Sequence, residues 1–335
     1  MQHKATKEHQ PGTGSQLTRA QIVKTPSYLP LSSSTNPALP LMSSVPLPRP
    51  GDVRTGGYLI GTRRPVDCEA EGVFVKRIQW GGRDIIVKYG ISVSSGEADV
   101  MRMIKANTSI PVPKVYGVVH EEATGETFIY MELVDGITLA EAWSNLSPLE
   151  LAAIQRDFSA YVAELATLEP PHDVVLGACN NKLDTRVGES CHALLVRKPE
   201  PVMRTIEDFA GWIRSEMDRR RGALLRLPPS PANLDQLLTS SVVGFVHADL
   251  HGENILIKNG RIAAIIDWEL TGWLPRIVEP LALVGYIKKR RYGCPPAMEG
   301  LLSTFDLEPE TREGLLFVHM ALNAGPDSAH WAESW

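Results

Sequence analysis

The pattern of apolar and polar residues changes along the chain and divides it into four parts. Residues 1–52 are rich in Pro and Ser and show no sustained helical or strand periodicity, so we expect a disordered extension. Residues 53–135 carry short apolar runs of the kind that form strands. Residues 136–325 carry apolar residues mostly at helical spacing, and residues 326–335 follow as a flexible tail. A β-rich lobe followed by a mainly helical lobe is therefore expected.

The β-rich part is predicted to contain strands and one helix. The predicted strands are residues 73–78, 84–89, 115–119 and 128–134. Gly81 and Gly82 separate the first two strands and indicate a hairpin. Ser94 and Glu97 have the Ser-x-x-Glu spacing of a capping box and predict the start of a helix. The chain near residues 131–137 would then connect the two lobes.

The second part is predicted to be helical with one inserted hairpin. Ser147, Pro148 and Glu150 combine an N-cap residue, a proline at the first helical position and an acid at the third, which predicts the start of a long amphipathic helix. A second amphipathic helix is expected around Trp212. Residues 255–258 and 261–266 flank Asn259-Gly260, a strong two-residue hairpin turn. These features indicate an α+β fold.

Three polar residues around this hairpin form a candidate catalytic group. Asp249 and Asn254 lie in the loop that enters the hairpin, and Asp267 lies where its second strand ends. Hairpin geometry brings these loop regions together. Phosphoryl transfer requires a carboxylate that orients a hydroxyl group, and oxygen ligands for Mg²⁺ on the nucleotide phosphates. The three residues supply both, although turn and capping positions are the commoner use of Asp and Asn in loops.

This part of the chain resembles a known family. Its sequence, His247-Ala248-Asp249-Leu250-His251-Gly252-Glu253-Asn254 followed by a short hairpin and Asp267, is similar to the His-x-Asp-x-x-x-x-Asn signature of the aminoglycoside phosphotransferase and choline-kinase-like branch of the protein-kinase superfamily. The resemblance implies a protein-kinase-like two-lobed fold. It has a small antiparallel-β N-lobe with one helix, and a larger, mainly helical C-lobe that carries the catalytic-loop hairpin.

The resemblance also implies a role for individual residues. Asp249 would be the catalytic base, and Asn254 and Asp267 would be ligands of Mg²⁺. Lys88 would bind the α- and β-phosphates of ATP, and Glu97 would pair with Lys88. The cofactors implied are therefore ATP and Mg²⁺.

The connector between the lobes also looks like that of the family. Its backbone around Met131 and Leu133 would meet the adenine ring. The sequence departs from the family pattern at two places. No Gly-rich nucleotide loop is evident in residues 67–72, and Gly252 stands where many members have Pro.

Several of these residues have a competing interpretation. Lys88 alone would more often be a solvated strand lysine, and the capping box explains Glu97 without any lysine partner. His247 and His251 have no further His or Cys at ligand spacing, so zinc is not favoured and His247 is interpreted as a hydrogen-bonding prop of the loop. Two more acids, Glu269 and Glu279, could be ordinary surface carboxylates or could attract a cationic acceptor.

Composition limits the classes of partner. The formal net charge of −5 offers no broad basic surface, so neither nucleic acid nor a membrane is expected as a partner. The four cysteines show no Cys-x-x-Cys pair and are interpreted as reduced thiols. No apolar run approaches the roughly 20 residues of a membrane span, and no signal peptide is evident, so a cytoplasmic location is expected. A transit peptide within residues 1–52 is the alternative, because residues 9–51 contain no acid.

The function expected from these observations is ATP-dependent phosphorylation of a hydroxyl group on a small molecule, such as an aminoglycoside-, choline- or metabolite-like acceptor. No protein partner is predicted, and the chain would be a monomer or a weak dimer. A nucleotide-binding pseudokinase or regulatory module is the alternative. A protein kinase is disfavoured because Asp267-Trp268-Glu269 replaces the Asp-Phe-Gly triplet and no Ala-Pro-Glu segment follows. The acceptor itself is not readable from residues 170–204 or from the segments after 270, which would build its pocket.

Overall fold

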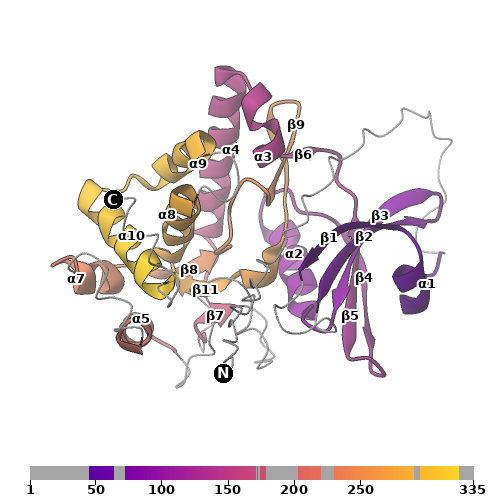
Figure 1. The fold of residues 1–335 in the computed structure, drawn as a ribbon, viewed down its shortest axis with the longest axis horizontal. Coiled ribbons are helices and arrows are strands. Elements are labelled where there is room, and N and C mark those ends of the chain that lie inside the picture. The colour runs from indigo at the N-terminus through magenta and orange to yellow at the C-terminus, as the bar shows by residue number, and fades with distance from the viewer. Residues whose placement is uncertain are drawn as a thin grey trace, which may run out of the picture.

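The computed structural model describes residues 45–63, 72–170, 172, 174–178, 203–219, 230–289 and 295–323. The predicted tail at 326–335, and the part of the predicted extension before residue 45, lie outside these residues. Within them, a β-rich lobe lies beside a mainly helical lobe (Figure 1). The predicted α+β architecture is therefore confirmed.

The N-lobe is built on one antiparallel sheet. Its elements are α1 (Pro50–Thr55), β1 (Tyr58–Arg63), β2 (Val73–Trp80), β3 (Arg83–Gly90), α2 (Ser95–Asn107), β4 (Val115–Glu121) and β5 (Glu126–Glu132). The strand order is β1-β2-β3-β5-β4. Gly81 and Gly82 form the predicted turn between β2 and β3, and both have positive φ, as the tight turns of hairpins require. This sheet places Lys88 in β3, at its centre.

The N-lobe begins earlier in the chain than predicted. The indole nitrogen of Trp80 donates a hydrogen bond to the carbonyl oxygen of Pro46 at 2.8 Å, and the hydroxyl of Tyr130 donates to that of Pro48 at 2.7 Å. Val53 of α1 is fully buried in the same apolar cluster as both aromatic side chains. The predicted disorder therefore does not hold for residues 45–52. The partners on the proline segment are backbone carbonyls, which a side-chain pattern does not reveal.

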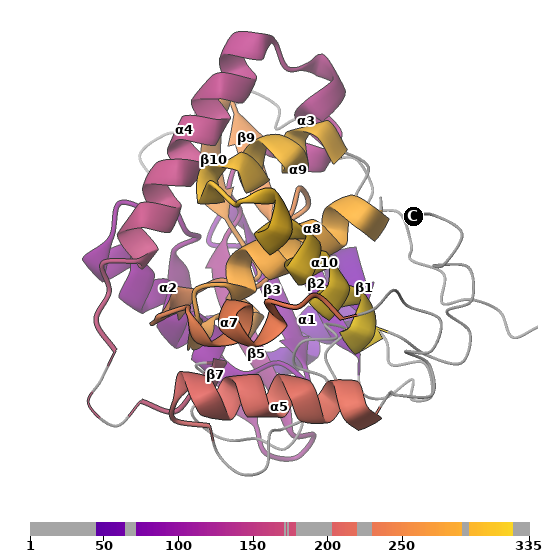
Figure 2. The same ribbon diagram turned by 90° about the vertical axis from the view of Figure 1, so that its left-hand side faces the viewer.

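The C-lobe follows the connector. Its elements are β6 (Ile137–Thr138), α3 (Leu139–Ala142), η3 (Trp143–Asn145), α4 (Pro148–Leu165), β7 (Gly177–Ala178), α5 (Ile206–Arg219), α7 (Leu234–Thr239), β8 (Val243–Val246), β9 (Ile255–Lys258), β10 (Arg261–Ile265), η5 (Trp268–Leu270), β11 (Gly272–Pro275), α8 (Val278–Lys289), α9 (Pro295–Leu302), η6 (Ser303–Phe305) and α10 (Pro309–Asn323). Figure 2 shows α8 in the middle of this lobe, with α4 above it and α5 below. None of the helices in the described ranges is long and apolar enough to cross a bilayer.

The β9–β10 hairpin is fixed on both of its sides. Its turn is the predicted Asn259-Gly260 pair, with φ of 52° and 69°. The outer edge of β9 pairs with β6, directly after the connector. On β10, the Arg261 guanidinium donates to both carboxylate oxygens of Asp157 in α4, at 2.7 and 2.5 Å. The hairpin that positions the candidate site is thus tied to the connector and to the longest helix.

The two predicted capping boxes have different outcomes. At the start of α4, Ser147 and Glu150 form the complete box, and Pro148 occupies the first helical position. At the start of α2, the hydroxyl of Ser94 accepts from the backbone N–H of Gly96 at 3.1 Å. The Glu97 side chain does not complete a box there and instead forms an ion pair with Lys88.

Candidate active site

Asp249 and Asn254 contact each other within the loop between β8 and β9. The side-chain amide nitrogen of Asn254 donates to the backbone carbonyl of Asp249 at 2.9 Å and to its carboxylate oxygen Oδ2 at 3.1 Å. Both side chains are buried. Because the amide nitrogen is used in this way, the amide oxygen Oδ1 is the atom that Asn254 can offer to a cation.

His247 supports the loop through two hydrogen bonds to the backbone. Its Nδ1 atom accepts from the backbone N–H of Asp249 at 3.3 Å, and its Nε2 atom bonds to the carbonyl oxygen of Ile266 at 3.1 Å. Both bonds form together only on a neutral ring that carries its proton on Nε2. The ring also packs edge-on against the buried indole of Trp268. His247 therefore joins the loop to the end of β10, which agrees with the structural, hydrogen-bonding role predicted for it.

A buried acid in α8 holds the backbone of the loop. The Oε2 atom of Glu279 accepts from the backbone N–H groups of His247 at 2.7 Å and of Ala248 at 3.2 Å. Ala248 has φ of 65°, a left-handed conformation that costs free energy for a residue with a Cβ atom. Burial raises the pKa of Glu279 to about 7, although the bonds from the loop oppose that shift. Glu279 is therefore a structural support and not the surface carboxylate that the sequence suggested.

Asp267 lies next to this loop. The backbone N–H of Ile266 donates to the carbonyl oxygen of Asn254 at 3.0 Å, which holds the chain just before Asp267 against the end of the loop. Asp267 itself has φ of 64° and ψ of 60°, again left-handed, at the turn into η5. One backbone hydrogen bond thus joins the two segments that carry the predicted metal ligands, and Asp267 stands at a strained turn.

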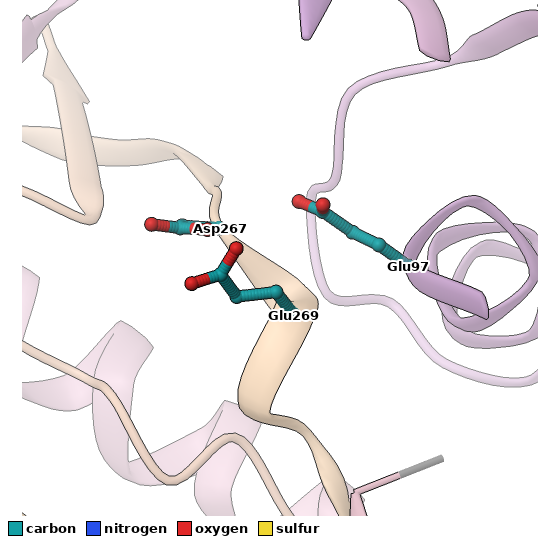
Figure 3. A group of neighbouring side chains, drawn as sticks. All are labelled: Glu97, Asp267 and Glu269. Atoms are coloured by element: carbon teal, nitrogen blue, oxygen red, sulfur yellow. The ribbon is translucent and has the colours of Figure 1, made fainter. Parts of the chain in front are cut away.

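Lys88 is the centre of a group of four charges. Its ammonium nitrogen lies 2.8 Å from Glu97 Oε2, 2.7 Å from Asp267 Oδ1 and 3.1 Å from Glu269 Oε2. Figure 3 shows Glu97 extending from α2 toward the segment that carries Asp267 and Glu269. Lys88 and Glu97 are both buried, so neither is the solvated side chain of the competing interpretation. One lysine of β3 therefore links α2 to the C-lobe.

Electrostatics at this group follow from burial and from the excess of carboxylates. Burial lowers the pKa of Lys88, but the charges of Asp267, Glu269 and Glu97 outweigh it and raise that pKa well above its usual value. Burial raises the pKa of Glu97 to about 7, with Lys88 opposing the shift and the other two acids adding to it. Lys88 stays charged, and three acidic side chains surround this single positive charge.

The donor atoms fit a hard cation. Carboxylate oxygens of Glu97, Asp267 and Glu269 all lie within 4.8 Å of one another. Oxygen ligands of this kind are those that Mg²⁺ prefers. Asp267 was predicted as a metal ligand, whereas Glu269 was not. The only feature of the sequence that points to Glu269 as a ligand is its position two residues after Asp267.

The connector residues lie where β5, an inner strand of the N-lobe sheet, ends. Met131 lies at the end of β5, is buried, and pairs with Ile86 of β3 and with Val115 of β4. Leu133 follows β5 and is half-buried. That these two residues meet the adenine ring stays a prediction. The sequence shows no Gly-rich loop in residues 67–72, and residues 67–71 lie outside the described residues.

Comparison with known proteins identifies a family. Residues 93–291 match the family model described as "Phosphotransferase enzyme family". The matched segment contains Glu97, the connector, the loop with Asp249 and Asn254, and Asp267, whereas Lys88 lies just before it.

Individual relatives are distant. The chain is similar to the crystal structure of aminoglycoside phosphotransferase APH(4)-Ia, with 18% identity, 82% of this chain and 91% of that chain covered, and a TM-score of 0.52. A thermostable mutant of that enzyme, in a ternary complex with AMP-PNP and hygromycin B, has 17% identity, coverage of 84% and 93%, and a TM-score of 0.48. The first of these matches shows that the fold is that of the kinase-like phosphotransferases.

One relative among the curated proteins is named as a dehydrogenase and not as a phosphotransferase. The probable acyl-CoA dehydrogenase IBR3 of Arabidopsis thaliana is 26% identical over 188 residues, which are 52% of this chain and 20% of that protein. The chain therefore spans about a fifth of the length of this relative.

Proposed function

The chain belongs to the phosphotransferase enzyme family, and from this premise we propose that it transfers the γ-phosphoryl group of ATP, with Mg²⁺, to a hydroxyl group of a small molecule. The observation that carries the proposal is the contact of Lys88 with both Glu97 and Asp267, beside a loop in which Asn254 orients Asp249. These are the parts that phosphoryl transfer requires, since its catalysis is mostly positioning and electrostatic stabilisation.

Asp249 acts on the acceptor. Its carboxylate accepts a hydrogen bond from the acceptor hydroxyl, orients that oxygen toward the γ-phosphorus and takes the proton. A bond forms between the acceptor oxygen and the γ-phosphorus, while the bond from that phosphorus to the β–γ bridging oxygen breaks. ADP leaves with the bridging oxygen.

Lys88 acts on the nucleotide. Its ammonium binds oxygens of the α- and β-phosphates and keeps its contact with Glu97, while it exchanges Asp267 and Glu269 for phosphate. Those two carboxylates and the Asn254 amide oxygen would hold Mg²⁺. When bound, Mg²⁺ neutralises charge on the phosphates. The backbone near Met131 and Leu133 receives the adenine ring.

The acceptor is proposed only as a class. A cationic or neutral hydroxylated molecule suits a chain with a formal net charge of −5. An aminoglycoside is the first candidate, because the fold is similar to that of aminoglycoside phosphotransferase APH(4)-Ia. Choline-like and metabolite-like acceptors are the next.

The test is a search for a phosphorylated product. The protein is incubated with ATP and Mg²⁺ and with hygromycin B, a macrolide or choline, and each acceptor is analysed by mass spectrometry for the gain of one phosphoryl group. We expect one acceptor to be modified, and the modification to stop when EDTA removes Mg²⁺. Tight binding of ATP without modification of any acceptor, and without ADP formation, would favour a nucleotide-binding regulatory module. Phosphorylation of a generic protein substrate would favour a protein kinase.

A further inference from the structure

A tyrosine that the sequence did not single out contacts the catalytic carboxylate. Tyr286 lies in α8, is 6% exposed, and its hydroxyl donates a hydrogen bond to the Oδ1 atom of Asp249. Its ring packs edge-on against the ring of His251, with centroids 4.8 Å apart and an angle of 69° between the planes. The phenol is therefore held in place on two sides, by a ring contact and by a hydrogen bond.

His251 adds to the same contact. Its Nδ1 atom accepts from the backbone N–H of Glu253 at 3.2 Å, so a neutral ring carries its proton on Nε2. That Nε2 atom lies 3.5 Å from Asp249 Oδ1, at the outer limit of a hydrogen bond. The Oδ1 side of the carboxylate thus faces Tyr286 and His251, while the Oδ2 side faces Asn254.

Helix α8 supports the loop at two points. Glu279 binds its backbone, and Tyr286, seven residues later, binds the carboxylate. Seven residues are about two helical turns, so both side chains project from one face of the helix. Helix α8 is a rigid support for this purpose, because its residues Leu281, Leu283 and Val284 are buried in the core of the lobe.

We propose that Tyr286 is a positioning residue for phosphoryl transfer, which fixes the rotation of the Asp249 carboxylate so that it meets the acceptor hydroxyl. The inference rests on the proposed function. Rotation of a carboxylate about its last bond is otherwise broad, whereas catalytic groups act only within a narrow range of orientations. Donors on both sides of the Asp249 carboxylate narrow that rotation before any substrate binds.

In a competing interpretation, the Tyr286 hydroxyl hinders the reaction instead of supporting it. In that case the Tyr286 hydroxyl occupies the place of the acceptor hydroxyl on Asp249 and must be displaced. The two interpretations predict changes in different kinetic constants. A positioning residue raises kcat, whereas a competing hydroxyl raises the KM for the acceptor.

The test is Tyr286→Phe, which removes the hydroxyl and keeps the ring against His251. Tyr161→Phe is the matched control, because Tyr161 is a half-buried tyrosine of α4 in the same lobe. Steady-state kinetics are measured for ATP and for an acceptor that the product search identifies, followed as ADP formation. We expect kcat to fall roughly tenfold in Tyr286→Phe with both KM values unchanged, and Tyr161→Phe to behave as the wild type.

Three results would overturn the inference. An unchanged kcat would leave the tyrosine a packing residue, and a lower KM for the acceptor would make it a competing hydroxyl. Strictly additive shifts of Tm in Asp249→Ala, Tyr286→Phe and the double variant would contradict the contact itself. Failure of the proposed function is distinguishable, since the wild type would then form no ADP and no phosphorylated product.

Discussion

The ammonium nitrogen of Lys88 lies 2.7 Å from the Asp267 carboxylate, although 179 positions separate the two residues in the chain. This contact joins the N-lobe sheet to the strained turn after the β9–β10 hairpin. Glu97 completes it from α2. The charged group around Lys88 is therefore assembled across the two lobes, whereas the loop with Asp249 and Asn254 is assembled within one.

Removal of the Lys88 ammonium group should leave the acids Glu97, Asp267 and Glu269 without the positive charge that they surround. In Lys88→Met we expect the free energy of unfolding to fall by about 3–5 kcal/mol, because a buried charge group loses its partner. Mg²⁺ without nucleotide should raise the Tm of this variant more than that of the wild type, because the acids are then offered only to the metal. Thermal and urea unfolding with and without Mg²⁺ measure both effects.

The matched control is Lys258→Met. Lys258 is half exposed and pairs with the equally exposed Asp135, so its loss should change stability by no more than about 1 kcal/mol. Equal stabilisation of the wild type and of Lys88→Met by Mg²⁺ would argue that the three acids do not bind the cation.

Glu279 makes stability depend on pH in a direction opposite to that of a salt-bridged acid. Its pKa is raised from 4.5 to about 7 in the folded chain, so the unfolded chain releases the proton first as pH rises. The stability that Glu279 contributes is complete below pH 4.5 and is lost as pH rises to about 7. Glu279→Gln keeps an acceptor oxygen for the loop without titrating.

Urea unfolding of Glu279→Gln and of the wild type should therefore differ increasingly with pH. We expect the variant to gain stability relative to the wild type between pH 4.5 and 7, by up to about 3 kcal/mol. A difference that stays constant across this range would show that the carboxyl is not protonated in the folded chain.

The proline segment before α1 should stabilise the N-lobe. A chain that begins at Pro50 loses the carbonyl partners of Trp80 and Tyr130. Each buried donor left without a partner costs about 1–3 kcal/mol. We expect this truncation to lower the Tm clearly more than one that begins at Val45, as measured by circular dichroism. Equal Tm values would place the start of the N-lobe at α1.

Local sequence patterns predicted the parts of the fold that local interactions determine. The Asn259-Gly260 turn, the cap at Ser147 and the β2–β3 hairpin all depend on residues a few positions apart. The Lys88–Glu97 pair was predicted from the family resemblance, because spacing alone equally supported a capping box at Ser94.

The supports of the site were not predictable, because their partners lie far apart in the chain. Glu279 and Tyr286 contact the loop with Asp249 from 31 to 37 positions away, and in the sequence they look like an ordinary acid and an ordinary aromatic residue. The pairing of β6 with β9 and the Pro46 carbonyl contact depend on backbone groups, which side-chain patterns do not report.

We propose that Asp249 carries out transfer on a nucleotide that Lys88 and the metal ligands hold. The decisive variant is Asp249→Asn, assayed for ADP formation from ATP and Mg²⁺ with the best acceptor, and for AMP-PNP binding by calorimetry. We predict that ADP formation falls by roughly 10²–10⁴-fold while AMP-PNP binding changes by no more than a few-fold. ADP formation at the wild-type rate in Asp249→Asn would contradict the account.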